Sequence, residues 1–507
     1  MIPLSALMAL IFTSCGEEEP PPPPALADLP TLPEPVSEVE FSRADERDPV
    51  ELRIALVGEV RGEIEPCGCP TLPYGGFVRR ERLLKTLPSP LFHLDAGETL
   101  LKGFSASRTD RGERAELVMT LSEMVGVDAW SPGPSDLLAV GIEGLRRAPV
   151  PAISANWRDA DGDLLLKPWI VLEEAGVRLG VIGLSGTISD PEQRDSISVE
   201  DPAEAAAQAL SSLPAELDLV VALGSISDEA AARVAMLDGI SAVLTTRGRA
   251  YDAPEAGEHG LLVEAPDRGR YVEVLHVRVG AGAGEPLRML PEERLWQELL
   301  TLRTQSTVAT APQKVATISS ALAEREAVFS EDGRGRNLVF VEHTPLSSAL
   351  DGEADSTSLL AAFKDDRLVK AAAAAASATS PTEPGYASAG RCVSCHEKEM
   401  ARWVLTDHAL AWQSLLIRDE ADNPECIGCH STGFGEPGGF GELSTGAIRK
   451  YKAVQCEACH GPLRGHPEDG AITSMPVTEA GCIQCHDAAN SPDFELASYL
   501  RRASCQQ

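Results

Sequence analysis

The pattern of apolar and polar residues divides the chain into two parts. From residue 51 to about 280, short apolar runs alternate with segments whose apolar residues recur at helical spacing. Buried strands that alternate with amphipathic helices indicate an α/β domain with a largely buried sheet. The pattern over residues 291 to about 328 predicts a long helix. A short strand, NLVFVEH, and another helix follow it. We therefore expect an α/β domain from residue 51 to 370.

The pattern changes after residue 370. Residues 371–390 begin as possible helix and end as a linker rich in Pro, Gly and Ser. The segment 391–507 is poor in aliphatic residues and holds nine of the twelve cysteines. So short a segment with so few apolar side chains needs bound cofactors to complete a core. We expect a small, mostly helical and loop-rich domain here.

The amino terminus reads MIPLSALMALIFTSCGEEE, a short apolar run with a small residue before Cys15. The run is too short to span a bilayer and is typical of an export signal. Residues 1–15 resemble a bacterial lipoprotein signal, in which Cys15 carries the lipid. A cleaved secretory signal and a misplaced start codon are the alternatives. Residues 16–50 are rich in Pro and Glu and predict an unfolded linker.

The formal net charge of −33 limits the class of partner. A nucleic-acid partner is excluded, because binding would require cationic side chains to neutralise the phosphate backbone. An acidic surface can instead steer cationic proteins toward it. The charge therefore favours a cationic protein partner.

Four copies of the pattern Cys-x-x-Cys-His lie in the carboxyl-terminal segment. Two intervening residues let both sulfurs form thioethers with one porphyrin, and the next residue then places its imidazole on the iron. We therefore predict four covalently bound c-type haems. Numbered along the chain, the motifs are motif 1 (Cys392, Cys395, His396), motif 2 (Cys426, Cys429, His430), motif 3 (Cys456, Cys459, His460) and motif 4 (Cys482, Cys485, His486).

Zinc sites and disulfides are the alternatives for these cysteines. Two Cys-x-x-Cys pairs would satisfy one zinc ion, and disulfides would suit an exported chain. Neither explains why a histidine follows every pair, so haem attachment is the stronger interpretation.

Four irons have eight axial positions, and the motif histidines fill only four of them. His408 lies on an apolar helical stripe, and His466 lies in a loop-like run after motif 3. Both are candidate distal ligands, to their own or to a neighbouring haem. Met400, Met475 and Cys505 are further candidates for the open positions. Alternatively, one or two haems keep an open face, which would allow redox catalysis.

The runs NPECIGCHSTGFGEPGGF and VQCEACHGP, with the downstream His466, resemble the multihaem cytochromes c typified by the tetrahaem carrier of bacterial hydroxylamine oxidation. The resemblance covers about residues 391–500 and includes the W…DHA helix. It implies closely stacked haems that pass single electrons, mostly with two histidine ligands each. Many relatives carry a histidine near the carboxyl terminus where this chain has Cys505.

The front domain resembles the 5′-nucleotidase-like, calcineurin-type metallophosphoesterases. This resemblance implies an α/β sandwich fold for residues 51–370. The resemblance rests on RIALVGEVRGEIEPCGCP, LFHLDAGETL, PAISANW, VRLGVIGLSG and VLTTRGR, in that order. The family binds two metal ions through aspartates, histidines and an asparagine, and most of these are replaced here. The residues at the corresponding positions are Glu59, Arg61, Asp95, Glu98, Pro134, Ser135, Asp136, Ser225, Arg247 and Arg249.

A two-metal phosphoesterase needs neutral imidazoles and carboxylates around its cations. Arginines at three of these positions would repel a metal, so we expect the domain to keep the fold and to lack hydrolase chemistry. The arginines either bind an anion or, as we favour, pair with nearby carboxylates. Cys67 and Cys69 in EPCGCP admit a disulfide, a soft-metal site or free thiols.

The leading hypothesis is an exported tetrahaem cytochrome c that relays electrons between redox partner proteins. It would lie in the periplasm or be held at the outer membrane through a lipid on Cys15, with the front domain as a docking or sensing module. One alternative is a redox enzyme that converts a small nitrogen or sulfur species at an open haem. The other is a phosphoesterase with a cytochrome tail. The sequence does not decide the oligomeric state.

Overall fold

The computed structural model describes fifteen stretches of the chain: residues 50–66, 73–101, 108–246, 255–256, 260–280, 286–289, 302, 312–332, 337–377, 385–418, 420–463, 465–466, 477–486, 491 and 494–503. The predicted export signal, the linker before Val50 and several singled-out residues lie outside these stretches. Among the helices within them, none is long and apolar enough to cross a membrane. The singled-out residues outside the described stretches are Cys15, Cys67, Cys69, Arg247, Arg249, Met475 and Cys505.

The front domain contains two six-stranded sheets. In the first, the strand order is β13-β14-β12-β1-β2-β3. β1, β2 and β3 are parallel, whereas β12 runs antiparallel to β1. The bounds are β1 (Val50–Val57), β2 (Leu91–Asp95), β3 (Ala129–Trp130), β12 (Tyr271–Val279), β13 (Leu287–Met289) and β14 (Asn337–Pro345).

The second sheet has the order β10-β11-β9-β8-β6-β5, in which β6, β8, β9 and β11 are parallel. A separate two-stranded ladder joins β4 (Trp157–Arg158) to β7 (Ser198–Val199). The bounds in the second sheet are β5 (Trp169–Glu174), β6 (Val177–Gly183), β8 (Leu219–Gly224), β9 (Ala242–Thr246), β10 (Glu255–Ala256) and β11 (Leu261–Ala265).

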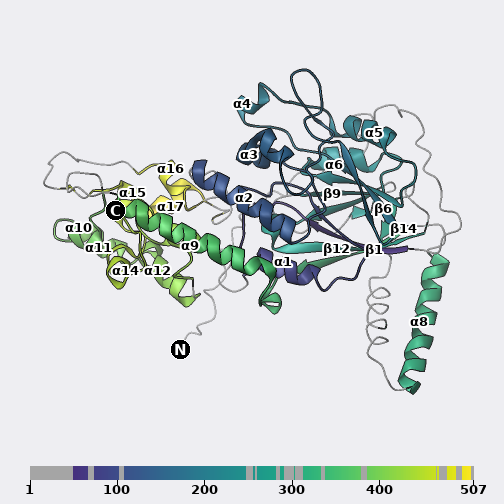
Figure 1. The fold of residues 1–507 in the computed structure, drawn as a ribbon. Coiled ribbons are helices and arrows are strands. Elements are labelled where there is room, and N and C mark those ends of the chain that lie inside the picture. The colour runs from purple at the N-terminus through teal and green to yellow at the C-terminus, as the bar shows by residue number, and fades with distance from the viewer. Residues whose placement is uncertain are drawn as a thin grey trace, which may run out of the picture.

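The side-chain alternation of β1 shows how the layers form. Leu52, Ile54 and Leu56 are fully buried in the core between the sheets, whereas Ala55 and Val57 face the helices outside. α1, α2 and α3 cover that outer face of the first sheet, and α5 and α6 cover the second sheet (Figure 1). The bounds of these helices, and of the short helix α4 between α3 and α5 in the chain, are α1 (Phe77–Leu84), α2 (Arg108–Met124), α3 (Pro134–Arg146), α4 (Pro191–Arg194), α5 (Pro202–Ser212) and α6 (Asp228–Ala235).

The α/β domain predicted from the alternating pattern is therefore confirmed, and its two sheets form the sandwich that the resemblance implied. Of the region where one long helix was predicted, residues 291 to about 328, the structure describes residue 302 and, from residue 312, helix α8 (Pro312–Asp332). The predicted strand is β14. The helix that follows, α9 (Asp355–Ala376), runs through residue 370 into the expected linker. The described chain is thus helical across the domain boundary predicted at residue 370.

In Figure 1, α9 extends from the sheets of the front domain to a cluster of short helices. This cluster is the carboxyl-terminal domain, and it is helical and loop-rich as predicted. A small core of Trp412, Leu415, Ile427, Phe440 and Tyr451 holds it together. Its helices are α10 (Ala389–Cys392), α11 (Glu397–Trp403), α12 (Asp407–Ile417), α13 (Pro424–His430), α14 (Thr445–Tyr451), α15 (Cys456–His460), α16 (Glu479–Cys482) and α17 (Leu496–Ala503).

Candidate haem-binding site

Each Cys-x-x-Cys-His motif forms about one turn of helix. In motifs 1 and 4 the histidine N–H donates to the carbonyl of the first cysteine, at 2.9 Å in His396 and 2.8 Å in His486. Motifs 2 and 3 lie within α13 and α15. One turn of helix brings residues four apart onto the same face. The first sulfur and the imidazole of each motif therefore lie on one side of the chain, as attachment to one porphyrin requires.

Caps stabilise these short helices locally. Asn423 precedes α13, and its side chain accepts a hydrogen bond from the Glu425 N–H at 3.0 Å, with proline at the first helical position. Thr478 caps α16 in the same way through the Gly481 N–H at 3.3 Å. Local sequence thus sets where motifs 2 and 4 begin to turn.

The fold brings the motifs together in two pairs. A hydrogen bond between the thiols of Cys392 and Cys456 lowers the pKa of Cys392 to about 7, which places motif 1 beside motif 3. The Cys429 thiol donates to the carbonyl of Gln484 at 3.9 Å, which places motif 2 beside motif 4. In addition, α15 of motif 3 packs against α16 of motif 4.

Both histidines predicted as distal ligands lie opposite a motif histidine. The ring centroids of His396 and His466 are 6.4 Å apart, and those of His408 and His486 are 6.0 Å apart. Two imidazoles on opposite sides of one metal, each with a metal–nitrogen bond of about 2 Å, place their ring centroids about 6 Å apart. Both pairs therefore have the spacing that an iron between them requires.

Hydrogen bonds orient two of the motif imidazoles. The Nδ1 atom of His430 lies 2.8 Å from the carbonyl of Ala411 and 3.1 Å from the Ser414 hydroxyl. The Nδ1 atom of His486 lies 2.8 Å from the Ser491 hydroxyl. Metal-ligating histidines commonly donate their second N–H in this manner, which directs Nε2 toward the metal. No sequence pattern pointed to Ser414 or Ser491, because their contacts depend on the fold.

The electrostatic setting also suits ligation. Burial, and next the neighbouring His486, lowers the pKa of His408. A neutral imidazole is the form that binds a metal. His408 is therefore held in the form able to bind iron.

The carboxyl-terminal domain exposes apolar side chains that a porphyrin would cover. Leu405 is 86% exposed and Ile417 is 77% exposed. These side chains are therefore available to pack against a bound porphyrin. An open cavity of about 420 Å³ lies beside the small core, between α12 and α14. The exposed large apolar residues of this domain are Val393, Val404, Leu405, Leu410, Leu416, Ile417 and Ile483.

The residues present thus fit covalently attached haem. Within the described stretches no group of three or more His, Cys, Asp and Glu converges. His460 is exposed at the end of α15, and Met400 lies half-buried in α11. Met475 and Cys505, the other candidate ligands, lie outside the described residues.

The front domain holds a second group of predicted site residues, after β1 and β2. Glu59, Arg61 and Glu98 have φ angles of 46°, 51° and 58°, in the left-handed region that non-glycine residues rarely adopt. Arg61 donates to Glu59 at 2.9 Å, and the Ser135 hydroxyl donates to Glu98. Burial raises the pKa of Glu98. Arg61 therefore pairs with a nearby carboxylate, as we favoured for the arginines at the metal-ligand positions.

The aspartates at this end of the sheet serve the protein's own backbone. The Asp136 carboxylate accepts four backbone N–H groups, from Glu98, Thr99, Leu100 and Gly133, at 2.7 to 2.8 Å. Asp95 accepts from the Gly97 N–H at 2.9 Å and the Thr99 hydroxyl at 2.7 Å. Burial raises the pKa of Asp95 to about 6. These carboxylates hold loops in place.

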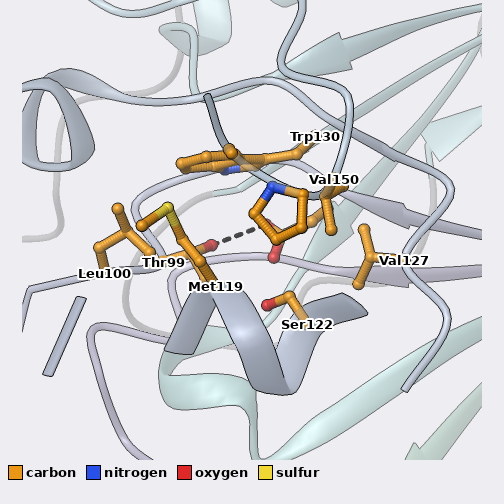
Figure 2. A pocket seen from close by; sticks show the side chains of 10 residues that line it. Thr99, Leu100, Met119, Ser122, Val127, Trp130 and Val150 are labelled. Carbon is orange, nitrogen blue, oxygen red and sulfur yellow. Dashed lines mark hydrogen bonds between the residues drawn. The ribbon is translucent and has the colours of Figure 1, made fainter. Parts of the chain in front are cut away.

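A small cavity lies beside Asp95. Figure 2 shows Thr99, Trp130 and Ser122 among the side chains that line it. The Thr99 hydroxyl donates to Asp95, which also lines the cavity. Its volume is about 10 Å³, close to that needed for one water molecule. This cavity is far too small for a nucleotide or another phosphoester.

Comparison with known proteins agrees with these features. Residues 391–461 match the family model described as cytochrome c554 and c-prime. Cytochrome c-554 from Nitrosomonas europaea is 33% identical over 106 residues, which cover 18% of this chain and 44% of that cytochrome. The match therefore spans less than half of that relative's length.

Solved structures similar to this chain include hydrolases. A 5′-nucleotidase precursor from Thermus thermophilus is 18% identical with a TM-score of 0.45, covering 73% of this chain and 68% of the nucleotidase. A calcineurin-like phosphoesterase from Bacillus subtilis is 14% identical with a TM-score of 0.37, covering 55% of this chain and 99% of its own. The similarity to cytochrome c554 concerns the carboxyl-terminal segment, where residues 391–461 match the family model.

Proposed function

We propose that the chain is an exported c-type cytochrome that holds four haems and relays electrons. The observation that carries the proposal is the presence of two pairs of facing imidazoles, whose ring centroids are 6.4 Å and 6.0 Å apart. Each pair consists of one motif histidine and one histidine outside the motifs. When bound, each haem supplies one-electron exchange at its iron. The motif cysteines would hold the porphyrins. His466 would be the second histidine ligand to the iron at motif 1, and His408 would be the second at motif 4.

The packing of the motifs supports a continuous route for electrons. Motif 1 adjoins motif 3 through Cys392 and Cys456, and motif 2 adjoins motif 4 through Cys429 and Gln484. The contact between α15 and α16 joins the two pairs. The chain therefore holds its attachment sites in the spatial order 1–3–4–2, with motifs 1 and 2 at the ends.

Charge and the amino-terminal pattern support the rest of the proposal. The net charge of −33 suits a cationic redox partner, and association should weaken as salt rises. Export would place the protein in the periplasm, and a lipid on Cys15 would hold it at the membrane. The front domain would serve as a docking or sensing module.

Stepwise reduction of the full chain tests the relay. We expect a spectroelectrochemical titration of the protein, matured in a host that attaches haem, to require four one-electron components. We also expect electron exchange with a cationic redox protein to slow with ionic strength. A titration described by fewer components, or exchange that is indifferent to salt, would contradict the respective part of the proposal.

One observation favours a second candidate function, redox catalysis at motif 2. Within the described part of the chain, no second imidazole ring contacts His430, whose Nδ1 faces the Ala411 carbonyl and Ser414. An iron with one open face can bind a small ligand. A high-spin ferric signal that shifts on addition of cyanide or nitrite would favour this candidate, whereas purely low-spin haem would exclude it.

We further propose that the front domain is not a phosphoesterase. Arg61 pairs with Glu59 where the family has metal ligands, and Ser225 stands where it has a histidine. A guanidinium between carboxylates neutralises the charge that would otherwise attract a cation. We expect the full chain to show no metal-dependent hydrolysis of nucleotides, and measurable hydrolysis that chelation abolishes would refute this.

A further inference from the structure

A single arginine of the front domain connects three parts of the molecule. Arg114 lies on α2, and its Nη1 donates to the carbonyl of Gly62 at 2.9 Å, in the loop that follows β1. Its Nη2 pairs with Glu425 on α13. Its guanidinium also lies 6.0 Å from the ring centroid of Phe363 on α9. Arg114 therefore links the remnant phosphoesterase loop, the connecting helix and the helix of motif 2.

A second cluster supports the same junction. Glu65, at the end of the loop after β1, accepts hydrogen bonds from Asn423 at 2.8 Å and from Lys364 of α9 at 2.7 Å. Burial acts to lower the pKa of Lys364, but Glu65 and nearby carboxylates raise it overall, so the lysine stays charged. Asn423 is also the residue that caps α13. The front domain thus contacts the first turn of α13 through two separate groups.

The connecting helix fits closely against the haem-binding domain. A Cβ atom added to Gly441 would lie 2.3 Å from the Ala375 Cβ and 2.9 Å from the Ala371 carbonyl. The Gly438 N–H also donates to the Ala375 carbonyl at 2.8 Å. Helix α13 itself also packs against α9. The Arg114–Glu425 contact therefore lies at a closely packed junction.

The position of Glu425 gives this contact a consequence for haem chemistry. Glu425 directly precedes Cys426, the first cysteine of motif 2. The side chains of Arg114 and Glu425 are only 11% and 10% exposed. Charges screened little by water act strongly on their neighbours, and the charge around a haem shifts its reduction potential. A carboxylate without its arginine would favour the oxidised iron, which carries one more positive charge.

We infer that Arg114 is a positioning residue for the haem of motif 2, through which the front domain fixes helix α13 and sets that haem's reduction potential. This inference rests on the proposed electron-relay function. The front domain would thus influence electron relay by acting on motif 2, which lies at one end of the series of motifs.

Charge substitutions in the haem-loaded full chain test the inference. We expect Arg114→Gln to lower one of the four midpoint potentials at neutral pH, and Glu425→Gln to raise the same one. In the double variant the midpoint should return close to its native value. The control is Arg146→Gln, which breaks the exposed Arg146–Glu143 pair on α3 and should move no midpoint.

Opposite shifts from the two partners are the deciding result, because general loosening of the structure would shift both variants in one direction. Shifts of the same sign, or four unchanged midpoints, would overturn the inference. If Arg114→Gln fails to accumulate, Glu425→Gln alone decides, and a raised single midpoint supports the inference while an unchanged or lowered one refutes it. A wild-type protein without haem would instead refute the proposed function.

Discussion

Replacing the distal histidines one at a time gives a quantitative test of the ligand assignment. His466 is 6.4 Å from His396, and His408 is 6.0 Å from His486, measured between ring centroids. Each pair would hold one iron between two imidazoles, which is a strong ligand field and gives low-spin ferric haem. His466→Ala removes one of the two imidazoles at motif 1 only.

The expected size of the change follows from the number of motifs. One motif in four is affected, so His466→Ala should convert a quarter of the haem from low-spin to high-spin ferric iron. His408→Ala should convert another quarter, at motif 4, and the double variant should convert half. Spin quantitation by electron paramagnetic resonance, normalised to total haem, measures these fractions. Free imidazole should restore the low-spin signal by entering the space left by the side chain.

A matched control separates ligation from damage to the helix. Gln413 is exposed on α12, the helix that carries His408, so Gln413→Ala should leave the spin state unchanged. If His466→Ala and His408→Ala bind a full complement of haem and give no new high-spin signal, the assignment is wrong. The same holds if one substitution affects two haems.

Three further predictions concern stability. Gly441→Ala should lower the free energy of unfolding by about 1–3 kcal/mol, because its Cβ would overlap Ala375. Gly446→Ala, whose Cβ would lie 4.0 Å from the Ser444 Oγ within α14, should not lower it in urea unfolding. Asp136→Ala should lower the free energy of unfolding by at least about 4 kcal/mol in the same assay, since four buried N–H groups lose their acceptor. A smaller decrease would contradict this and would mean that the loops rearrange. Burial acts to raise the pKa of Glu81, but hydrogen bonds from Lys85, Ser356 and Asp355 outweigh it and lower the pKa to about 2. The stabilising contribution of Glu81 is therefore complete above its ordinary pKa of 4.5 and falls away as the pH drops toward 2. Glu81→Gln should flatten the loss of stability between these two pH values, and an unchanged acid profile would contradict this.

The sequence identified those features whose chemistry is local. Covalent attachment of a porphyrin fixes the spacing of Cys392, Cys395 and His396, so the motifs are visible without a structure. The alternation of apolar runs likewise predicted an α/β domain, because each buried strand, such as Leu219–Gly224, is recognisable over a few residues.

Pairings between distant residues could not be predicted from the sequence. His408 was a candidate ligand, but its position opposite His486 depends on how α12 packs, and no spacing rule specifies it. The ion pair of Arg114 with Glu425 joins residues 311 positions apart. Both side chains resemble ordinary surface charges in the sequence, and only their burial at the junction of two domains distinguishes them.

The central claim is that haem is bonded through the cysteines of the four motifs. Intact mass spectrometry of the denatured full chain, matured in a host that attaches haem, tests it most directly. The account predicts a polypeptide heavier by four haems, with the eight motif thiols inert to alkylating reagents. A mass equal to that of the polypeptide alone, with those eight thiols reactive after reduction, would contradict it.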